Sequence, residues 1–360
     1  MAGLDKTMNR ETLYLILTLV GGASALLSWA LAFATQRFAR RIEAIDYPKG
    51  GRKIHTVPTP LLGGLGIGLI ILIAFGALSI FVNVPHWSIT GLMIAMVILL
   101  IGGALDDRYD LPAKYQIIFP VAASAIAVFF GLSIQFITNP IGGSISLEYL
   151  VVGGIALLPS LLAFFWLLGV TYATKVMDGL DGLVTGQVVI GASLIIALSL
   201  TQRYYQPSMA ILAAVVCGAF IGFLPHNVNP AKQFLGESGS TLAGFLLGSL
   251  AILSGAKLAT ALMVLGLPIA DLFFVLFGRL RRGVSLFKGD DSHLHHKLIK
   301  AGLDKRHAVY LLWSLTALAG AAGLFVQTRG KALLFIFLCA VTAGLSAWAD
   351  ASYKQRQKSL

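Results

Sequence analysis

Acidic and imidazole side chains are scarce in this sequence, and they gather in four short clusters. The clusters are Asp106-Asp107-Arg108-Tyr109-Asp110, Asp178-Gly179-Leu180-Asp181-Gly182-Leu183, Gly236-Glu237-Ser238-Gly239-Ser240 and His293-Leu294-His295-His296. Adjacent carboxylates such as Asp106 and Asp107 suit a hard divalent cation and a phosphate substrate, because one can ligate the ion while the other accepts a proton or orients a nucleophile. By itself such a pair is equally typical of a solvated helix end, with acids paired to Arg108 and Lys114.

The second and third clusters place carboxylates beside glycines. Asp178 and Asp181 are three residues apart, so a helical turn would put both on roughly one face, and the glycines permit close approach of the backbone to a ligand. A polar turn that caps the following helix is the alternative. Glu237 stands at the start of an apolar run whose N–H groups can hold an anion, and its carboxylate suits either a metal ion or a helix cap.

The histidines of the fourth cluster lie in a long basic connection. The HxHH pattern lacks the cysteine partners and spacing of a zinc finger, and no HExxH occurs. Imidazoles beside Arg and Lys instead suit a phosphate or nucleotide, with a basic loop that binds anionic lipid as the alternative. Asp271 lies inside an apolar run, and we expect it to be a structural partner of Arg279 or of a neighbouring helix.

The elements that must position these clusters are membrane-spanning helices. Hydrophobic residues make up 57% of the 360 residues and charged residues only 12%, against roughly 45–50% and about 25% in soluble proteins. This composition excludes a soluble two-domain enzyme. A span needs about 20 mostly apolar residues, and such runs occur near residues 13–35, 60–82, 89–105, 116–137, 159–173, 183–200, 209–224, 241–253, 258–278, 308–326 and 332–348. The sequence therefore predicts an all-α polytopic membrane protein with about 11 transmembrane helices in one domain over 1–360, and an interfacial helix ahead of the fifth span.

The distribution of positive charge predicts the orientation. With the N-terminus outside and the C-terminus cytoplasmic, 21 of the 27 Lys and Arg residues lie on the cytoplasmic side, as the positive-inside rule requires. The net charge of +11 thus reflects cytoplasmic loops, and no nucleic-acid partner is expected. All four clusters fall on this same side. We expect one inward-facing site built from the connections 36–59, 106–115, 174–182, 225–240 and 279–307.

The order and spacing of the clusters resemble those of the polyprenyl-phosphate N-acetylhexosamine-1-phosphate transferases, the MraY/WecA superfamily, over nearly the whole chain. Two further landmarks agree: Asp46-Tyr47-Pro48 with Arg52-Lys53-Ile54-His55 and the 60–64 segment, and Asn227 with Pro230-Ala231-Lys232. The resemblance implies transfer of a sugar-1-phosphate, GlcNAc-1-phosphate in the branch that looks closest, from a UDP-N-acetylhexosamine to undecaprenyl or a similar polyprenyl phosphate. UMP would be released at the cytoplasmic face of a bacterial plasma membrane, and the product would begin a cell-envelope glycan.

The resemblance also implies roles for individual residues. Asp106 and Asp107 would form the catalytic pair, and Mg²⁺ or Mn²⁺ would be held by Glu237 and Asp106. The residues expected to bind substrate are Lys53, Lys114, Asp178, Asp181, Asn227, His293, His295 and His296.

Four positions depart from the family pattern. Glu237 stands where the family usually has an aspartate that binds the metal ion, Tyr172 and Lys175 replace two asparagines, and Leu61 replaces an arginine. A charged lysine has no lone pair for Mg²⁺, so we hypothesise that Lys175 pairs with Glu237 or supplies part of the ion's charge. Independent effects of Lys175→Asn and Glu237→Asp on activity would contradict the pairing.

Two other functions stay open at this point. A secondary transporter would have a similar number of spans, although acids would then line a midplane path and we see no inverted repeat. A catalytically impaired relative that binds lipid is suggested by the departures at Lys175 and Glu237. The sequence leaves open the UDP-sugar, the polyprenyl length, the downstream glycan, a one-step or covalent mechanism, and the oligomeric state, for which a homodimer is one option.

Overall fold

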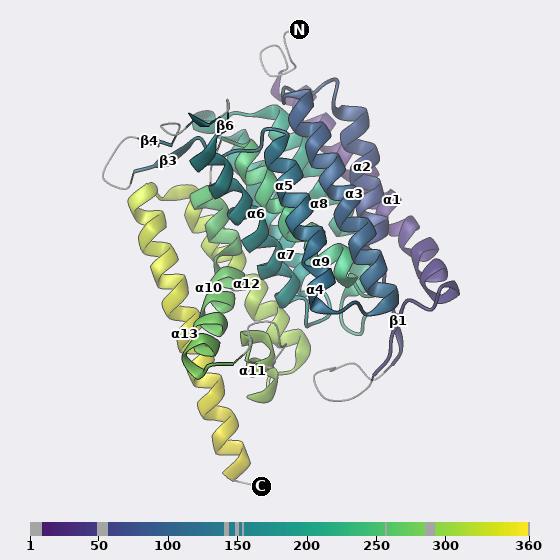
Figure 1. Cartoon of the computed structure of the whole chain (residues 1–360), viewed down its shortest axis with the longest axis vertical. Helices are drawn as coiled ribbons and strands as arrows, with labels where there is room; N and C mark the ends of the chain where they lie inside the picture. Colours follow the sequence, from purple (N-terminus) through teal and green to yellow (C-terminus); the bar gives the residue numbers. More distant parts are fainter. Residues whose placement is uncertain are drawn as a thin grey trace.

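The computed structural model describes residues 9–48, 57–139, 144–147, 151–152, 155–255, 258–284 and 292–358. Helices account for most of these residues (Figure 1). The helices are α1 (Arg10–Arg41), α2 (Gly63–Leu78), α3 (His86–Tyr109), α4 (Ala113–Gln116), α5 (Ile118–Phe129), α6 (Leu157–Met177), α7 (Leu183–Leu200), α8 (Pro207–Asn227), α9 (Gly236–Leu253), α10 (Leu258–Arg282), α11 (Leu294–Lys300), α12 (Lys305–Phe325) and α13 (Thr328–Lys358), with a short 3₁₀ helix at Gln202–Tyr204.

Within the described ranges, nine helices are long and apolar enough to cross a membrane, and they are α1, α3, α6 to α10, α12 and α13. Two shorter apolar segments, α2 and the nearly continuous α4 and α5, complete the set. Together they match the eleven predicted apolar runs in order. The structure therefore confirms the all-α polytopic fold.

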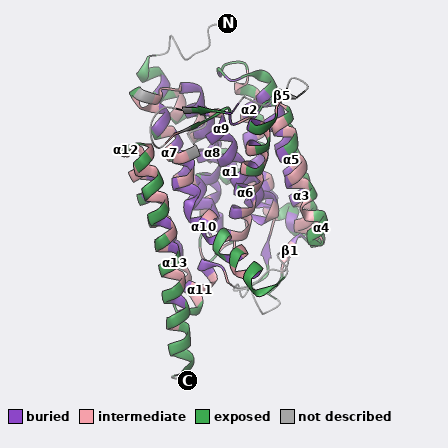
Figure 2. Cartoon of the chain, turned by 60° about the vertical axis from the view of Figure 1, so that its left-hand side comes forward, coloured by how far each residue is buried: buried purple, intermediate pink, exposed green. Residues whose placement is uncertain are grey.

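The helices differ in how deeply they are buried. The apolar windows of α8 and α9 are each 89% buried, whereas those of α1 and α13 are only 17% buried. In Figure 2 the buried residues accordingly concentrate in the middle of the bundle, and α13 is largely exposed along one side. Because a helix that is apolar all round must face either a protein core or lipid, α8 and α9 form the centre and α1 and α13 present their apolar surfaces outward.

Two glycines allow helices α2 and α3 to approach α9 at backbone distance. A Cβ atom on Gly64 would lie 2.0 Å from the Gly239 nitrogen, and one on Gly103 would lie 2.2 Å from the Ser238 Cα. No side chain fits in either space. This close contact places the end of α3, which carries Asp106 and Asp107, directly against the beginning of α9, which carries Glu237.

The strands are short antiparallel pairs outside the helical bundle. Strand β1 (Ile45–Asp46) pairs with β2 (Thr59–Pro60), β3 (Phe136–Thr138) with β4 (Ser144–Ser146), and β5 (Val151–Val152) with β6 (Ile155–Ala156). The prediction of an interfacial helix ahead of the fifth span is therefore wrong, because β5 and β6 lie there. The fourth predicted span, 116–137, is helical only as far as Phe129. Val and Ile in this region favour strands over helices.

The ends of the helices separate the molecule into two unlike regions. Helix α1 begins at the upper end in Figure 1, where β3, β4 and β6 also lie. Strand β1, the short α4 and α11 lie at the lower end, and α13 ends beyond them (Figure 1). The acidic and histidine clusters lie at helix ends in this lower region, at the end of α3, after α6, at the start of α9 and at the start of α11.

Candidate active site

A cavity of about 690 Å³ opens at the lower end of the bundle, where the sequence clusters meet. Its lining comes from the 43–47 segment, the ends of α3, α6 and α8, the start of α9, and single residues near α11 and α12. The residues given a role or an ion pair in the sequence analysis that line it include Asp106, Asp107, Lys175, Asp178, Asp181, Asn227, Glu237 and His296. Groups up to 190 positions apart in the chain thus share one cavity.

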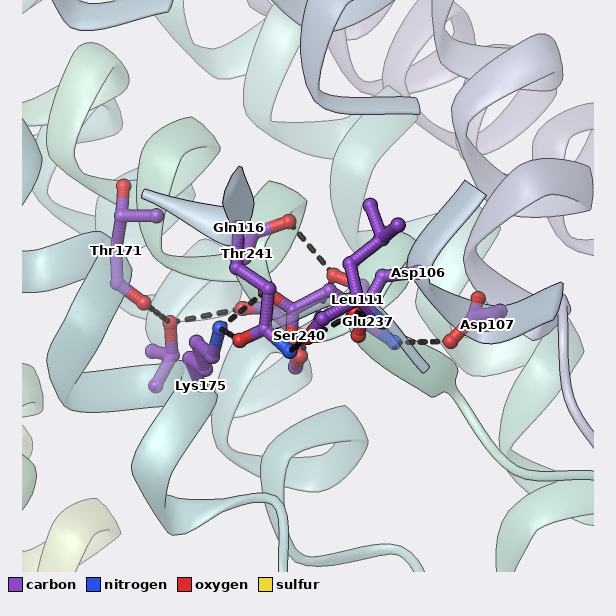
Figure 3. Close-up of polar contacts among 10 residues, drawn as sticks. Asp106, Asp107, Leu111, Gln116, Thr171, Lys175, Glu237, Ser240 and Thr241 are labelled. Carbon is purple, nitrogen blue, oxygen red and sulfur yellow. Dashed lines mark hydrogen bonds and ion pairs between the residues drawn. The ribbon is translucent and has the colours of Figure 1, made fainter. Parts of the chain in front are cut away.

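The two adjacent aspartates at the end of α3 have different surroundings. Asp106 Oδ1 accepts hydrogen bonds from the Leu111 backbone N–H at 2.9 Å and from Gln116 Nε2 at 2.9 Å. Asp107 instead accepts from the Glu237 N–H at 2.7 Å (Figure 3). It also accepts from Ser238 Oγ at 3.0 Å. Asp107 therefore caps the first turn of α9, where free N–H groups favour an anion, and Asp106 is fixed beside it.

The backbone at Gly236 makes that capping contact feasible. Gly236 has φ = +75°, a conformation that favours glycine, and a Cβ there would lie 2.5 Å from Asp107 Oδ2. The glycine thus allows the carboxylate to reach the first N–H groups of α9.

Lys175 and Glu237 form an ion pair, as the sequence hypothesis required. Lys175 Nζ lies 2.6 Å from Glu237 Oε1 and donates to Gln116 Oε1 at 2.8 Å. The exposed fractions of the two ionic side chains are 18% and 14%. Gln116 thereby connects the Lys175–Glu237 pair to Asp106, and the four side chains come from α3, α4, α6 and α9 (Figure 3).

Asp178 directly follows α6 and lines the cavity. Its carboxyl group has no hydrogen bond or ion pair with another residue of the described ranges. Burial, together with the nearby carboxylates of Glu237, Asp107 and Asp181, raises the pKa of Asp178 to about 8. A carboxyl surrounded by other carboxylates favours a bound cation, because a nearby positive charge stabilises its ionised form.

Asp181 and Asn227 both organise the connection after α8. Asp181 Oδ2 accepts from Asn229 Nδ2 at 2.9 Å and from the Ala231 N–H at 3.1 Å. Asn227 accepts from Thr185 Oγ1 at 2.6 Å and donates to the Gln233 carbonyl at 3.1 Å. Both line the cavity, and Asp181 Oδ2 and the Asn227 amide hold its wall together.

The three histidines of the HLHH motif lie in different environments. His293 Nδ1 lies 2.8 Å from Asp271 Oδ2, and Asp271 Oδ1 accepts from the Leu294 N–H at 2.8 Å. The expected structural partner of Asp271 is thus the start of α11. Only His296 among the three lines the cavity.

His295 is fully buried against the DGLDGL turn. A Cβ on Gly179 would lie 2.2 Å from His295 Nε2, so the ring packs directly on this glycine. Neither ring nitrogen has a hydrogen-bond partner among the residues described. Burial and the neighbouring His296 and His293 lower the pKa of His295 well below its usual range, so the ring is neutral at pH 7.

The two predicted substrate-binding lysines have different outcomes. Lys53 falls in the 49–56 segment, outside the described residues. Lys114 does not line the cavity, and its Nζ lies 4.9 Å from the centre of the Tyr115 ring.

Sequence reasoning missed Gln116, which bridges Asp106 and Lys175, and Lys305, which lines the cavity from the first turn of α12. Gln116 stands between the acidic motif and the next apolar run, but a single glutamine in that position does not by itself indicate a role.

The cavity carries a surplus of negative charge. Among its lining residues are eight acids and three bases, and an anionic diphosphate would be repelled unless a cation were also bound. The lining carboxylate oxygens without a partner in the described ranges include those of Asp178 and Asp110 and the second oxygens of Asp106, Asp181 and Glu237. Oxygen ligands of this type suit Mg²⁺ or Mn²⁺.

The fold and the cavity together define a multi-pass membrane protein with an acidic site at one end of its helices. A family model for glycosyl transferase family 4 matches residues 89–255. A probable undecaprenyl-phosphate N-acetylglucosaminyl 1-phosphate transferase of Bacillus subtilis is 30% identical over 311 residues, which cover 84% of this chain and 83% of that relative. The chain therefore belongs to glycosyl transferase family 4.

Two other relatives are similar over most of their length. A decaprenyl-phosphate N-acetylglucosaminephosphotransferase of Mycobacterium tuberculosis is 30% identical over 361 residues, covering 89% of this chain and 85% of the relative. An undecaprenyl-phosphate alpha-N-acetylglucosaminyl 1-phosphate transferase of Escherichia coli is 28% identical over 305 residues, covering 82% and 80%. All three relatives are named for N-acetylglucosamine phosphotransfer to a polyprenyl phosphate.

Proposed function

We propose that this protein transfers GlcNAc-1-phosphate from UDP-GlcNAc to undecaprenyl phosphate or a similar polyprenyl phosphate, with release of UMP. The observation that carries the proposal is the convergence of Asp106, Asp107, Asp178 and Glu237 on one cavity at the ends of apolar helices. The names of the relatives point to the same reaction. The product would begin the synthesis of a cell-envelope glycan.

The position of the cavity suits two substrates of opposite solubility. A polyprenyl phosphate keeps its tail in the hydrocarbon and its phosphate at the boundary with water, where a soluble nucleotide sugar can also bind. The positive-inside distribution of Lys and Arg supports placing this end of the bundle on the cytoplasmic face of a bacterial plasma membrane. The N-terminus is then outside and the C-terminus cytoplasmic.

The attacking group is the phosphate monoester of the lipid. Its second pKa is about 6, so the phosphate is largely ionised at pH 7 and needs orientation more than deprotonation. Asp106 is held by Leu111 and Gln116 at the cavity wall, and we assign it the role of orienting this nucleophile. Asp107, with both oxygens bonded to the start of α9, keeps the two walls of the cavity together.

Mg²⁺ or Mn²⁺ is the cofactor that we propose for the acidic cavity, where the described residues do not already form a group of three metal ligands. Asp178 and the free carboxylate oxygens of Asp106 and Glu237 would hold it, and the ion would relieve the negative charge of the diphosphate during transfer. Asp181 and Asn227 shape the adjoining wall, and His296 is the histidine of the motif that lines the cavity, where we place it beside the nucleotide or its phosphates.

The direct test is UMP release by the purified protein supplied with UDP-GlcNAc, undecaprenyl phosphate and Mg²⁺. We expect turnover by the wild-type chain and a loss of about 10²-fold or more for Asp106→Asn, since a misplaced nucleophile costs about that much. Asp350 lies on α13, where its carboxylate pairs with Lys297. Asp350→Asn removes that carboxylate and should leave UMP release intact. A panel of UDP-sugars then identifies the donor.

The outcomes separate the proposed function from its rivals. No UMP release with any UDP-sugar, in protein that still binds lipid, would favour a catalytically impaired relative. Uptake of a solute into vesicles would favour a transporter.

A further inference from the structure

The ammonium group of Lys175 is fixed inside the acidic cavity by two acceptors. Its Nζ lies 2.6 Å from Glu237 Oε1 and 2.8 Å from Gln116 Oε1. It also lies 5.6 Å from the centre of the Tyr172 ring, within the range of a cation–π contact. A long flexible side chain is thereby held in one place (Figure 3).

The partners of this ammonium are themselves held. Gln116 Nε2 donates to Asp106 Oδ1 at 2.9 Å and to the Leu111 carbonyl at 2.7 Å, so its carbonyl oxygen must face Lys175. The Glu237 carbonyl accepts from Thr241 Oγ1 at 2.7 Å, and the Glu237 N–H is bound to Asp107. Lys175 thus belongs to a connected network that includes the aspartate pair at the end of α3.

One N–H of this ammonium has no acceptor within the described ranges. A lysine ammonium carries three donors, and Glu237 and Gln116 account for two of them. Lys175 also lines the cavity. A third donor on a fixed, largely buried cation is well suited to an anionic oxygen, because charge-assisted hydrogen bonds are the stronger ones.

The other basic groups of the cavity are placed differently. Arg108 lies 3.6 Å from Glu43 and its side chain is 35% exposed, and Lys305 lines the cavity from the start of α12. Lys175 is the base that pairs with Glu237 and is linked to Asp106 through Gln116. Its charge therefore acts where the carboxylates would otherwise repel a phosphate.

We propose that Lys175 is a substrate-binding residue whose third N–H binds a phosphate oxygen of the nucleotide diphosphate. Part of the positive charge needed at the site then comes from the protein, and Glu237 serves as the positioning residue for the ammonium. The proposal rests on the proposed function, since it names a contact of the same site with the diphosphate of the donor.

Binding measurements on matched variants test this contact. Glu237→Gln keeps the ammonium, whereas the double variant Lys175→Met/Glu237→Gln removes it without leaving an unpaired buried carboxylate, so the two proteins differ only at Lys175. We expect the double variant to bind UDP at least about tenfold more weakly than Glu237→Gln at saturating Mg²⁺, as the loss of one charge-assisted hydrogen bond predicts. Uridine, which lacks phosphate, should bind both equally.

Lys354→Met provides the control for removal of a lysine as such, because Lys354 is exposed on α13. It should bind UDP like the wild type. Lys175→Arg, which keeps the charge, should retain more UDP affinity than Lys175→Met. Equal UDP affinity of Glu237→Gln and the double variant, an equal loss for uridine, or absence of UDP binding by the wild type would each overturn the proposal.

The electron paramagnetic resonance of Mn²⁺ gives a readout that does not depend on turnover. Lys175→Asn removes a positive charge next to the carboxylates, and we expect it to bind Mn²⁺ at least about fivefold more tightly than the wild type does, since an adjacent like charge opposes cation binding. Unchanged or weaker Mn²⁺ binding would show that the ammonium does not act at the site of the ion.

UMP release by the wild type, assayed alongside, separates the two proposals. Turnover with no difference between the matched variants overturns the role of Lys175 and leaves the proposed function standing. No turnover, together with the expected difference in UDP affinity, overturns the function and leaves the phosphate contact standing.

Discussion

Replacement of Gly103 by alanine should push α3 away from α9 at the acidic cavity. Gly103 lies on α3 and packs on the backbone of α9, where an added Cβ would be 2.2 Å from the Ser238 Cα. Ordinary van der Waals contact begins at 3.4 Å, so α3 and α9 must move apart by about 1.2 Å. Neither atom in conflict belongs to a flexible side chain, and the backbone itself has to shift.

The displacement exceeds what the capping contact can absorb. The Glu237 N–H and Asp107 Oδ1 are 2.7 Å apart, and a further 1.2 Å takes them outside hydrogen-bond range. Overpacking costs about 1–3 kcal/mol, and a lost hydrogen bond to a charged group about 1.5–3 kcal/mol. Against these stands a gain of roughly 0.5–1 kcal/mol, because alanine is the better helix former.

The result should be visible in both stability and turnover. We expect Gly103→Ala to lower the thermal midpoint of the detergent-solubilised protein and to reduce UMP release by about 10²-fold, the effect of roughly 1 Å of misplacement at a reacting centre. Gly169→Ala is the matched control, since Gly169 lies on α6 with open space where its Cβ would be. Turnover by Gly103→Ala within threefold of the control would refute the link between this packing contact and the site.

Three further predictions follow from individual contacts. Lys175→Asn and Glu237→Asp should be non-additive in UMP release, with an interaction energy of about 0.5–3 kcal/mol, and additivity would contradict a functional pair. The pKa of His295 is lowered in the folded protein, so the unfolded chain binds a proton first as the pH falls below about 6.5. The free energy of unfolding should then fall by up to about 1.4 kcal/mol per pH unit. Thermal unfolding of His295→Gln at pH 5.5–7.5 should lack this part of the pH dependence. Asp271→Asn should release His293 and the start of α11, which increased proteolysis near residues 293–300 would report. Unchanged cleavage would show that the 2.8 Å contacts do not anchor the start of α11.

Several features of the site could not be read from sequence spacing. Lys175 and Glu237 are 62 positions apart, and the hypothesis of a pair arose only from their joint departure from the family pattern. The bridging role of Gln116 had no such pattern behind it, since a single glutamine next to an apolar run is unremarkable by itself. The HLHH motif was treated as one group of phosphate ligands, but the structure separates it into a partner of Asp271, a buried ring packed on Gly179, and a cavity residue.

The sequence by itself determined the class of protein and the end of the bundle at which its polar groups collect. Burial of peptide groups in hydrocarbon requires long apolar helices. Both the apolar runs that form these helices and the clusters of acids between them can be recognised in the sequence. Only the tertiary structure decided which carboxylate faces which partner, because that depends on helix contacts made at Gly64 and Gly103 between segments far apart in the chain. The end of α5 before β3 also depends on side-chain packing and strand pairing. Hydropathy alone does not predict either of these.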